Sequence, residues 1–421
     1  MTSRERLDAT LNHRQPDRVV VDLGATGQTG MSASTLYRFR KALGLEEKPV
    51  EISEMFQLLG RIEKDVMDWA GSDVVGLNMP SNMFGVPDGP LKPFRMPDGT
   101  PTLISEGNEY DVNPDGSMFL YPQGNRNATP SGHMPAGGYF FDNILSRVED
   151  FDEDNLIPAE DYANDFSVIS DETAAYLEKK SKFLFEETDY GIIGNLGGFG
   201  LGDSAIVAGP HLLEPKGIRR FDDWLAAHIL YPEYIRTVYE MQTEVMLKNL
   251  EIYRQAVGNR IQVVWLSGTD FGTQNSEFFS VDIFRDLYKP YYKKINDWVH
   301  QNTSWKTYYH CCGSIVNYLD EFVEMGVDVL NPVQVSARGM DANMLKDKYG
   351  DKLVFWGGGV DTQKTLPFGT PEEVRRQVRE RLEIFSKNGG YVFSPIHNVV
   401  AKTPVENIIA MYETVREFNG R

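Results

Sequence analysis

The chain has 421 residues, of which 41% are hydrophobic and 24% charged, a composition that supports a sizeable core and excludes wholesale disorder. Its 42 basic and 61 acidic residues give a net charge of −19, which argues against nucleic-acid or anionic-membrane binding, because affinity for phosphates rests on clustered Lys and Arg. No signal peptide or membrane span is visible and the only two cysteines are adjacent, so we expect a cytoplasmic protein without a disulfide scaffold.

The N-terminal half combines strands of a parallel sheet with a segment of a different character. Residues 73–77 and 191–194 are short apolar runs typical of buried strands. Between them, the segment 79–145 contains Pro-Asp-Gly turns at 87–89, 97–99 and 114–116, separated by short β-prone pieces. This pattern predicts an inserted β-meander that covers one end of the domain. We interpret the acidic stretch that follows, 146–172, as a solvated linker and helix start rather than a docking surface for a basic partner.

The C-terminal half alternates predicted strands with predicted helices. The helix that begins at Pro371 has a clear start signal, because Thr370 and Glu373 form a capping box. Five strand–helix units in succession predict a parallel sheet that is buried on both faces. The strands are predicted at 261–266, 306–309, 327–330, 353–356 and 391–393, and the helices at 281–300 with a kink at Pro290, 314–325, 344–349, 371–385 and 405–418.

These patterns leave two α/β architectures open. Seven strands are evident, whereas a closed (β/α)8 barrel needs eight. A doubly wound open sheet is the alternative, although no Gly-x-Gly-x-x-Gly turn opens a helix after any of the strands. In either case we predict one domain over residues 1–421, with 79–145 as its insertion.

A histidine and a cysteine two residues apart are the first candidates for chemistry. His310-Cys311-Cys312-Gly313 follows a predicted strand directly, which in a barrel places it on the C-terminal face, where active sites are built. Imidazole and thiolate together suit zinc. Cys311 is predicted not to be a ligand, because successive residues point in different directions. Taken alone, this motif is more typical of two buried cysteines beside a hydrogen-bonded histidine than of a metal site.

His397 strengthens the interpretation as a metal site. It follows the last predicted strand and therefore lies at the same end of the sheet as His310. With His310 and Cys312 it would form a three-ligand zinc site with an open position, which is the catalytic type. Alternatively, His397 contacts the substrate or caps a turn.

Further polar residues follow the predicted strands, as expected of a barrel mouth that binds a polar ligand. Each could also be a loop residue that satisfies backbone groups. Motifs for ATP-driven chemistry, serine hydrolysis and zincin proteolysis are absent from the sequence. The residues that we predict to bind substrate are Asn78, Asn195, Asp270, Gln274, Gln334 and Asp361.

Six motifs spread over nearly the whole chain resemble those of the uroporphyrinogen decarboxylase superfamily, and within it the methyltransferase-like branch. The resemblance implies an α/β fold, a (β/α)8 TIM barrel with an N-terminal helical extension, in which the β-meander 79–145 covers the barrel mouth. It also implies an eighth strand that the sequence pattern does not reveal. The motifs are NHRQPDRV at 12–19, GTDFGTQ at 268–274, HCCGS at 310–314, NPVQ at 331–334, GGGVD at 357–361 and SPIHN at 394–398.

The two branches of this superfamily differ in their site residues. True decarboxylases hold a tetrapyrrole with an arginine-glycine loop and an aspartate after the first barrel strand, whereas here the loop 24–30 has no arginine and the strand end carries Asn78. The methyltransferase branch binds zinc through His-x-Cys after one strand, matched by His310 and Cys312, and through a cysteine after the last strand. His397 stands roughly where that cysteine would be, and decarboxylases also carry a histidine near this point without binding metal.

The resemblance therefore implies a zinc-dependent methyltransferase that moves a methyl group between a corrinoid and a small thiol, methoxyl or related substrate. Coordination to zinc would deprotonate a thiol, and in the demethylating direction zinc would act as a Lewis acid on a methoxyl oxygen. A partner protein would supply the corrinoid, because the chain has no Asp-x-His-x-x-Gly motif. The alternatives are a metal-free decarboxylase and a non-catalytic homologue.

Overall fold

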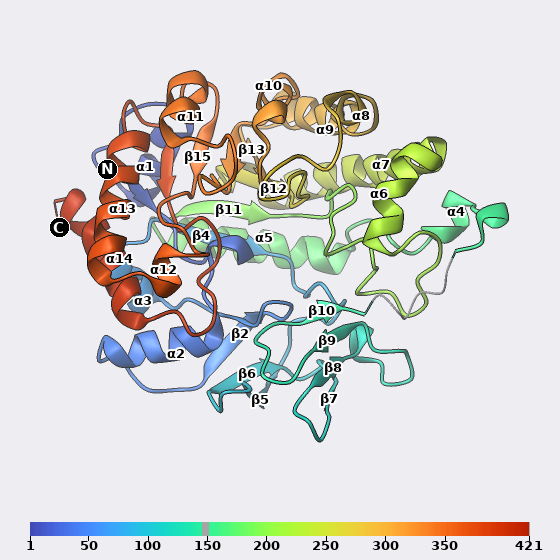
Figure 1. The fold of residues 1–421 in the computed structure, drawn as a ribbon, viewed down its shortest axis with the longest axis horizontal. Coiled ribbons are helices and arrows are strands. Elements are labelled where there is room, and N and C mark those ends of the chain that lie inside the picture. The colour runs from blue at the N-terminus through green and yellow to red at the C-terminus, as the bar shows by residue number, and fades with distance from the viewer. Residues whose placement is uncertain (145–150, 421) are drawn as a thin grey trace.

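Eight parallel strands form a nearly closed barrel at the centre of the computed structural model, which describes residues 1–144 and 151–420 (Figure 1). Neighbouring strands pair in the order β1-β16-β15-β14-β13-β12-β11-β4. The expected TIM-type barrel is therefore confirmed, and the open doubly wound sheet is wrong. The strands are β1 (Val20–Val21), β4 (Val74–Asn78), β11 (Gly191–Asn195), β12 (Val263–Ser267), β13 (Lys306–His310), β14 (Val329–Asn331), β15 (Val354–Trp356) and β16 (Tyr391–Phe393).

The strand that the sequence pattern missed is β1, which has only two residues. It pairs in parallel with β16, with Val20 opposite Val392 and Val21 opposite Phe393. Two residues show no periodicity, so nothing in the sequence distinguished them from a loop. On its other side, β1 meets the start of β4 through a backbone hydrogen bond of 2.7 Å from the Asp73 N–H to the Val21 carbonyl oxygen. This contact closes the barrel.

Strand side chains inside the barrel and a helix across its opening fill the N-terminal end. Inward-pointing side chains form a buried cluster, and α1 (Ser3–Leu11) adds Leu7 and Leu11 to it. The helix begins with a capping box in which Thr2 and Glu5 exchange hydrogen bonds. This helix is the expected N-terminal extension, and it plugs one end of the barrel. The strand residues of the cluster are Val20, Val74, Ile193, Val263, Tyr308, Val329, Val354, Trp356 and Val392.

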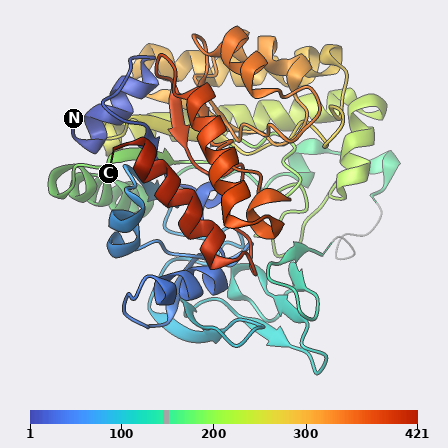
Figure 2. The ribbon, with the colours of Figure 1, turned by 60° about the vertical axis from the view of Figure 1, so that its left-hand side comes forward.

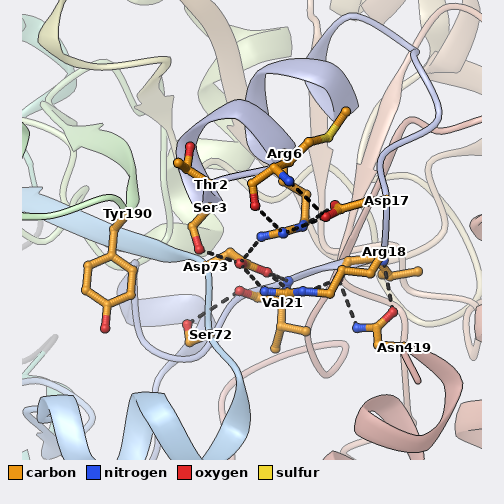
Figure 3. Close-up of polar contacts among 12 residues, drawn as sticks. Thr2, Ser3, Arg6, Asp17, Arg18, Val21, Ser72, Asp73, Tyr190 and Asn419 are labelled. Carbon is orange, nitrogen blue, oxygen red and sulfur yellow. Dashed lines mark hydrogen bonds and ion pairs between the residues drawn. The ribbon is translucent and has the colours of Figure 1, made fainter. Parts of the chain in front are cut away.

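A cluster of ion pairs ties α1 to the closing seam of the barrel, and we call it the seam cluster (Ser3, Arg6, Asp17, Arg18 and Asp73; Figure 3). The Asp73 carboxylate is fully buried and accepts hydrogen bonds from Arg6 at 2.8 Å and from Arg18 at 2.6 and 2.7 Å. Ser3 and the Val21 N–H donate to it at 2.6 and 3.1 Å. Arg6 also pairs with the half-exposed Asp17 at 2.7 Å. Every buried charge in this cluster therefore has partners.

Helices cover the outside of the barrel (Figures 1 and 2). The helix predicted over 281–300 is two helices separated at Tyr288, with Pro290 in the first turn of the second. The capping box of Thr370 and Glu373 is present as predicted. The helices are α2 (Ala33–Ala42), α3 (Lys64–Ala70), α4 (Pro158–Asp161), α5 (Asp171–Glu187), α6 (Phe221–Leu230), α7 (Pro232–Val257), α8 (Val281–Leu287), α9 (Lys289–Asn302), α10 (Leu319–Glu324), α11 (Ala342–Tyr349), α12 (Thr365–Phe368), α13 (Pro371–Phe385) and α14 (Val405–Phe418).

Two small sheets lie beside the barrel, at the bottom of Figure 1. The turns at 97–99 and 114–116 join strand pairs as predicted, with Gly99 and Gly116 at φ of +87° and +88°. The strands of this segment do not form the single meander that was predicted. They contribute to two sheets, and in one of them β6 pairs with β2, which precedes the segment 79–145. One sheet is β3 (Leu59–Gly60), β2 (Val50–Glu54), β6 (Pro101–Ser105) and β5 (Leu91–Arg95); the other is β10 (Asp142–Asn143), β9 (Gly132–Met134), β8 (Met118–Leu120) and β7 (Tyr110–Val112).

Most of the described residues of the acidic stretch, 151–172, are exposed, as a solvated linker would be, but an ion pair anchors the stretch to the rest of the chain. Residues 145–150 lie outside the described part of the chain. Beyond them, Asp165 is buried and accepts hydrogen bonds of 2.6 and 2.9 Å from the fully buried Arg219. Ser170 caps α5, which agrees with the predicted helix start. In the described ranges, no helix has the length and apolarity needed to cross a membrane.

Candidate metal centre

His310, Cys312 and His397 converge at the C-terminal end of the barrel. His310 is the last residue of β13, and His397 lies four residues beyond the end of β16. One ligand atom from each of the three residues lies within 4.8 Å of the other two. The Cys312 Sγ is 3.3 Å from the His310 Nε2, and the two imidazole ring centroids are 5.3 Å apart. The prediction that these residues meet at one end of the barrel is confirmed.

Asn331 fixes the orientation of His310. The Asn331 Nδ2 donates to the carbonyl oxygen of Trp356 at 2.8 Å, so its Oδ1 is the atom that faces His310 Nδ1, at 2.6 Å. An amide oxygen only accepts, so Nδ1 carries the imidazole proton and Nε2 keeps its lone pair. Nε2 is the nitrogen beside Cys312 Sγ. An outer partner of this kind is what a metal-binding histidine requires.

Burial lowers the pKa of both histidines to about 4. Both imidazoles are therefore neutral near pH 7, which is the form that binds a metal ion. Burial and the nearby carboxylate of Asp270 raise the pKa of the Cys312 thiol. Coordination to a metal would reverse that shift, because a coordinating thiol is deprotonated outright.

The turn that carries Cys312 is held from two sides. The Cys312 N–H donates to Asp270 Oδ1 at 2.6 Å, and the Gly313 N–H donates to Gln334 Oε1 at 2.7 Å. Gln334 in turn donates to Gln274 Oε1 at 3.0 Å. Asp270, Gln274 and Gln334 thus position the cysteine turn, and a direct contact of any of them with substrate stays a prediction.

Cys311 points away from the metal-ligand group. It is 2% exposed, and its Sγ accepts a hydrogen bond of 3.3 Å from the Phe271 N–H. Burial raises the pKa of its thiol, and no charged partner offsets that effect. Cys311 is a packing residue, which leaves Cys312 as the cysteine available to a metal ion.

The other predicted substrate residues lie in two places. Asn195 Nδ2 donates to Asn78 Oδ1 at 2.6 Å and to the Ala25 carbonyl oxygen at 2.7 Å, so the two asparagines meet at the ends of β11 and β4. Because β1 precedes β4, Asn78 ends the second barrel strand rather than the first. Asp361 is 8% exposed, and its Oδ1 accepts from the N–H groups of Gln363 and Lys364. Its carboxylate therefore stabilises a turn, and substrate binding by it stays a prediction.

Two residues of this region were not identified from the sequence. Asn331 begins the NPVQ motif at 331–334, but its bond to His310 depends on the register of β13 and β14, in which the two residues are opposite each other. Asp203 lies in an irregular segment between β11 and α6, where no periodicity marks it. Burial and the charge of Asp270 raise the pKa of Asp203 to about 7, and its Oδ2 lies beside Gly268, two residues before Asp270.

The comparison with known proteins agrees with this geometry. Residues 205–418 match the family described as Uroporphyrinogen decarboxylase (URO-D). The chain belongs to the uroporphyrinogen decarboxylase family. A solved structure described as a methyltransferase from Methanosarcina mazei is similar to it over 99% of both chains, with 16% sequence identity and a TM-score of 0.56. At that identity the likeness shows a shared fold. No curated protein matches the sequence.

Membership of this family of enzymes, together with a methyltransferase of the same fold, supports an enzyme. The loop 24–30 follows β1, as the arginine-glycine loop of the decarboxylases would, and it contains no arginine. Three potential metal ligands stand instead at the mouth. Within the uroporphyrinogen decarboxylase family, this combination agrees better with the methyltransferase-like branch.

Proposed function

We propose that this member of the uroporphyrinogen decarboxylase family is a zinc-dependent methyltransferase that moves a methyl group between a corrinoid and a small thiol, methoxyl or related substrate. The observation that carries the proposal is the convergence of His310, Cys312 and His397 on a volume the size of one ion. Ligand atoms 2.0–2.3 Å from a tetrahedral ion are roughly 3.3–3.8 Å apart; Cys312 Sγ and His310 Nε2 are 3.3 Å apart, and all three ligand atoms lie within 4.8 Å of one another.

The donor set fits a catalytic rather than a structural zinc site. Two imidazoles and one thiolate leave the fourth tetrahedral position for substrate. When bound there, zinc would supply the Lewis acidity that makes a substrate thiol nucleophilic at neutral pH, or that improves a methoxyl leaving group. The chain's own residues prepare this position. Asn331 holds His310 in one tautomer, and Asp270 holds the backbone of Cys312.

The corrinoid would carry the methyl group, and we propose that a separate protein presents it at the barrel mouth. The chain has no Asp-x-His-x-x-Gly sequence with which to hold a corrinoid itself. The proposal also assigns the two small sheets, most of whose strands come from 79–145, as a cover of the mouth. In support, Asn398, next to His397, donates a hydrogen bond to Gln57 in the β2–β3 connection, and the Phe141 N–H donates to the Phe56 carbonyl oxygen.

Metal analysis combined with methyl transfer tests the proposal. We expect the purified protein to contain about one zinc per chain and, in the presence of a thiol, to remove the methyl group of methylcobalamin. Cys311→Ser serves as the control, because it alters a thiol next to the site without removing a ligand. If the protein folds but neither retains zinc nor demethylates methylcobalamin, the proposal is wrong. A metal-free decarboxylase or a non-catalytic homologue is then the better interpretation.

A further inference from the structure

The barrel mouth contains carboxylates without cationic partners. Among residues 1–144 and 151–420, neither Asp203 nor Asp270 forms an ion pair with a lysine or an arginine; Asp270 Oδ1 lies 3.9 Å from the Nε2 of the neutral His310. The residues that end the barrel strands also include no lysine or arginine. They are Val21, Asn78, Asn195, Ser267, His310, Asn331, Trp356 and Phe393.

Asp203 has an oxygen that no described residue uses. Its Oδ1 accepts a hydrogen bond of 2.8 Å from the Ala205 N–H. Its Oδ2 lies beside Gly268, 3.1 Å from the position that a Cβ at this glycine would occupy, and it accepts no hydrogen bond from the part of the chain that the structure describes. Gly268 is two residues before Asp270, whose side chain is 35% exposed. Both carboxylates are therefore placed at the same strand end, beside the turn of Cys312.

An indole ring and an amide oxygen lie next to these carboxylates. Trp265 is opposite Tyr308 in the sheet. Tyr308 precedes His310 by two positions and is therefore on the same face of β13. The indole of Trp265 thus lies one layer of side chains further from the barrel mouth than His310. Gly268 and Gly197 flank the ring, with Cβ positions 3.2 and 2.8 Å from it. No side chain from either position covers the indole.

The amide oxygen belongs to Asn195. Its Nδ2 is committed to Ala25 and Asn78, which fixes the amide, and its Oδ1 is buried without a hydrogen-bond partner. A buried acceptor without a donor is costly, so an oxygen held in this way is expected to accept from a ligand or a water. The Trp265 Nε1 is likewise buried without a partner. These two atoms, on β11 and β12, have hydrogen-bonding capacity that no group among the described residues satisfies.

We propose that the substrate of this site is a small organic cation, an ammonium compound such as an aminothiol. Its charged end lies between Asp203, Asp270 and the indole of Trp265, and its reacting end lies at the metal centre. Carboxylates without counterions attract an ammonium group, the indole face adds a cation–π contact, and the Asn195 Oδ1 accepts from N⁺–H. This inference rests on the proposed function, because that function places the reacting atom at His310, Cys312 and His397.

The metal ion does not remove the need for a cation. The double positive charge of zinc is balanced by the Cys312 thiolate and a substrate thiolate, because both imidazoles are neutral. Asp203 and Asp270 then remain without a lysine or arginine partner among the described residues, and an anionic end on the substrate would oppose their ionisation. The mouth is therefore expected to discriminate against substrates that carry a carboxylate or a sulfonate.

Thiols of matched size and different charge test the inference on the zinc-loaded protein. We expect cysteamine to bind about tenfold or more tightly than 3-mercaptopropionate, with 2-mercaptoethanol between them, as measured by calorimetry. In Asp203→Asn the ratio of cysteamine to 3-mercaptopropionate affinity should fall by about fivefold, while zinc content and 2-mercaptoethanol binding stay the same. Comparing ratios between variants cancels the intrinsic acidity of each thiol.

Asp282→Asn is the matched control, because it removes the same charge from a side chain of α8 that is 91% exposed. It should leave the ratio unchanged. Equal or tighter binding of 3-mercaptopropionate, or an unchanged ratio in Asp203→Asn, would overturn the inference and leave the proposed function intact. If 2-mercaptoethanol fails to bind the zinc-loaded protein, methyl transfer to a thiol is excluded, and both the proposed function and this inference are wrong.

Discussion

Each end of the barrel holds an aspartate, fully buried at the N-terminal end and 35% exposed at the C-terminal end, and the two lie in opposite surroundings. At the N-terminal end, the Asp73 carboxylate accepts hydrogen bonds from two arginines, a serine and a backbone N–H (Figure 3). At the C-terminal end, Asp270 has one backbone donor and no lysine or arginine among the described residues. A fully paired charge stabilises the fold, whereas a partly paired one is left to interact with something the chain does not supply.

The same contrast holds for the ligand atoms. In the seam cluster each charged group is matched by another group of the protein. At the mouth, His310 Nδ1 is bound by Asn331, while its Nε2 lies 3.3 Å from the Sγ of Cys312, another potential ligand. The Nδ1 of His310 is therefore held by the protein, and its Nε2 is left available to a metal ion. The difference indicates which end evolved for stability and which for chemistry, and the variants below test it.

Asp73→Ala should have the largest effect on folding. It would leave the buried guanidinium groups of Arg6 and Arg18 without their shared partner, and breaking a buried pair in this way costs about 3–5 kcal/mol. Urea unfolding should show this loss. Asp68→Ala is the control, because its carboxylate is 55% exposed and interacts with an exposed lysine and, at 3.5 Å, with the Tyr190 hydroxyl. Equal stability of the two variants would contradict the structural role of the seam cluster.

Cys312→Ser should leave the fold stable and lower zinc affinity by more than about 100-fold, which exceeds the range typical of changes outside the ligand shell. Cys311→Ser should retain zinc and methyl transfer. Metal analysis after dialysis against a graded series of chelator concentrations measures both variants. Full zinc retention by Cys312→Ser would refute the site as described.

His397→Ala distinguishes a third ligand from a substrate contact. If His397 binds zinc, its removal should lower zinc affinity about tenfold or more, because two protein ligands hold the ion weakly. If it contacts only substrate, zinc content should stay full while methyl transfer from methylcobalamin decreases. We expect the first result, since the ring lies 5.3 Å from that of His310.

Asn331→Ala should weaken zinc binding by about 10–100-fold without removing a ligand, because it frees His310 to adopt the other tautomer. A chelator competition assay measures the change. Asn317→Ala, at an exposed position in the same region of the chain, provides the control. Unchanged zinc affinity in Asn331→Ala would show that the packing around His310 alone fixes its orientation.

Asp17→Asn should have the smallest effect. The hydrogen bond from Arg6 holds the pKa of the Asp17 carboxyl well below its usual range. A lowered folded-state pKa means that this stabilisation is present above about pH 4 and decreases as the pH falls below it. Because Asp17 is 42% exposed, solvent screening limits the effect to less than about 1 kcal/mol. Urea unfolding at pH 7 and pH 3 should show a smaller pH dependence in the variant, and an identical pH dependence would exclude this contribution.

The sequence predicted those parts of the fold that repeat a local signal. The strand 391–393 and the helix 405–418 match the structure at both ends, because an apolar run and an amphipathic stretch are each recognisable from the local sequence alone. β1 and the β2–β3 pair were missed, since strands of two residues or of mixed polarity depend on their neighbours for recognition. Local sequence patterns therefore identify single helices and strands, whereas the composition of a sheet depends on which strands pair, and that pairing is not encoded locally.

The candidate site divides in the same way. His310, Cys312 and His397 could be placed together from the sequence, because residues after parallel strands share one end of a barrel. The bond from Asn331 to His310 and the position of Asp203 beside Gly268 could not, because they depend on register and on the course of an irregular segment.

The plug formed by α1 has a consequence for the order of events in the proposed reaction. With Leu7 and Leu11 filling the N-terminal end of the barrel, reactants reach the metal centre from the opposite end. A small substrate that lies beneath a large corrinoid protein must enter before that protein docks and leave after it departs. Steady-state kinetics should then follow a compulsory order, and an excess of the corrinoid protein should inhibit turnover by closing the entrance on an empty site.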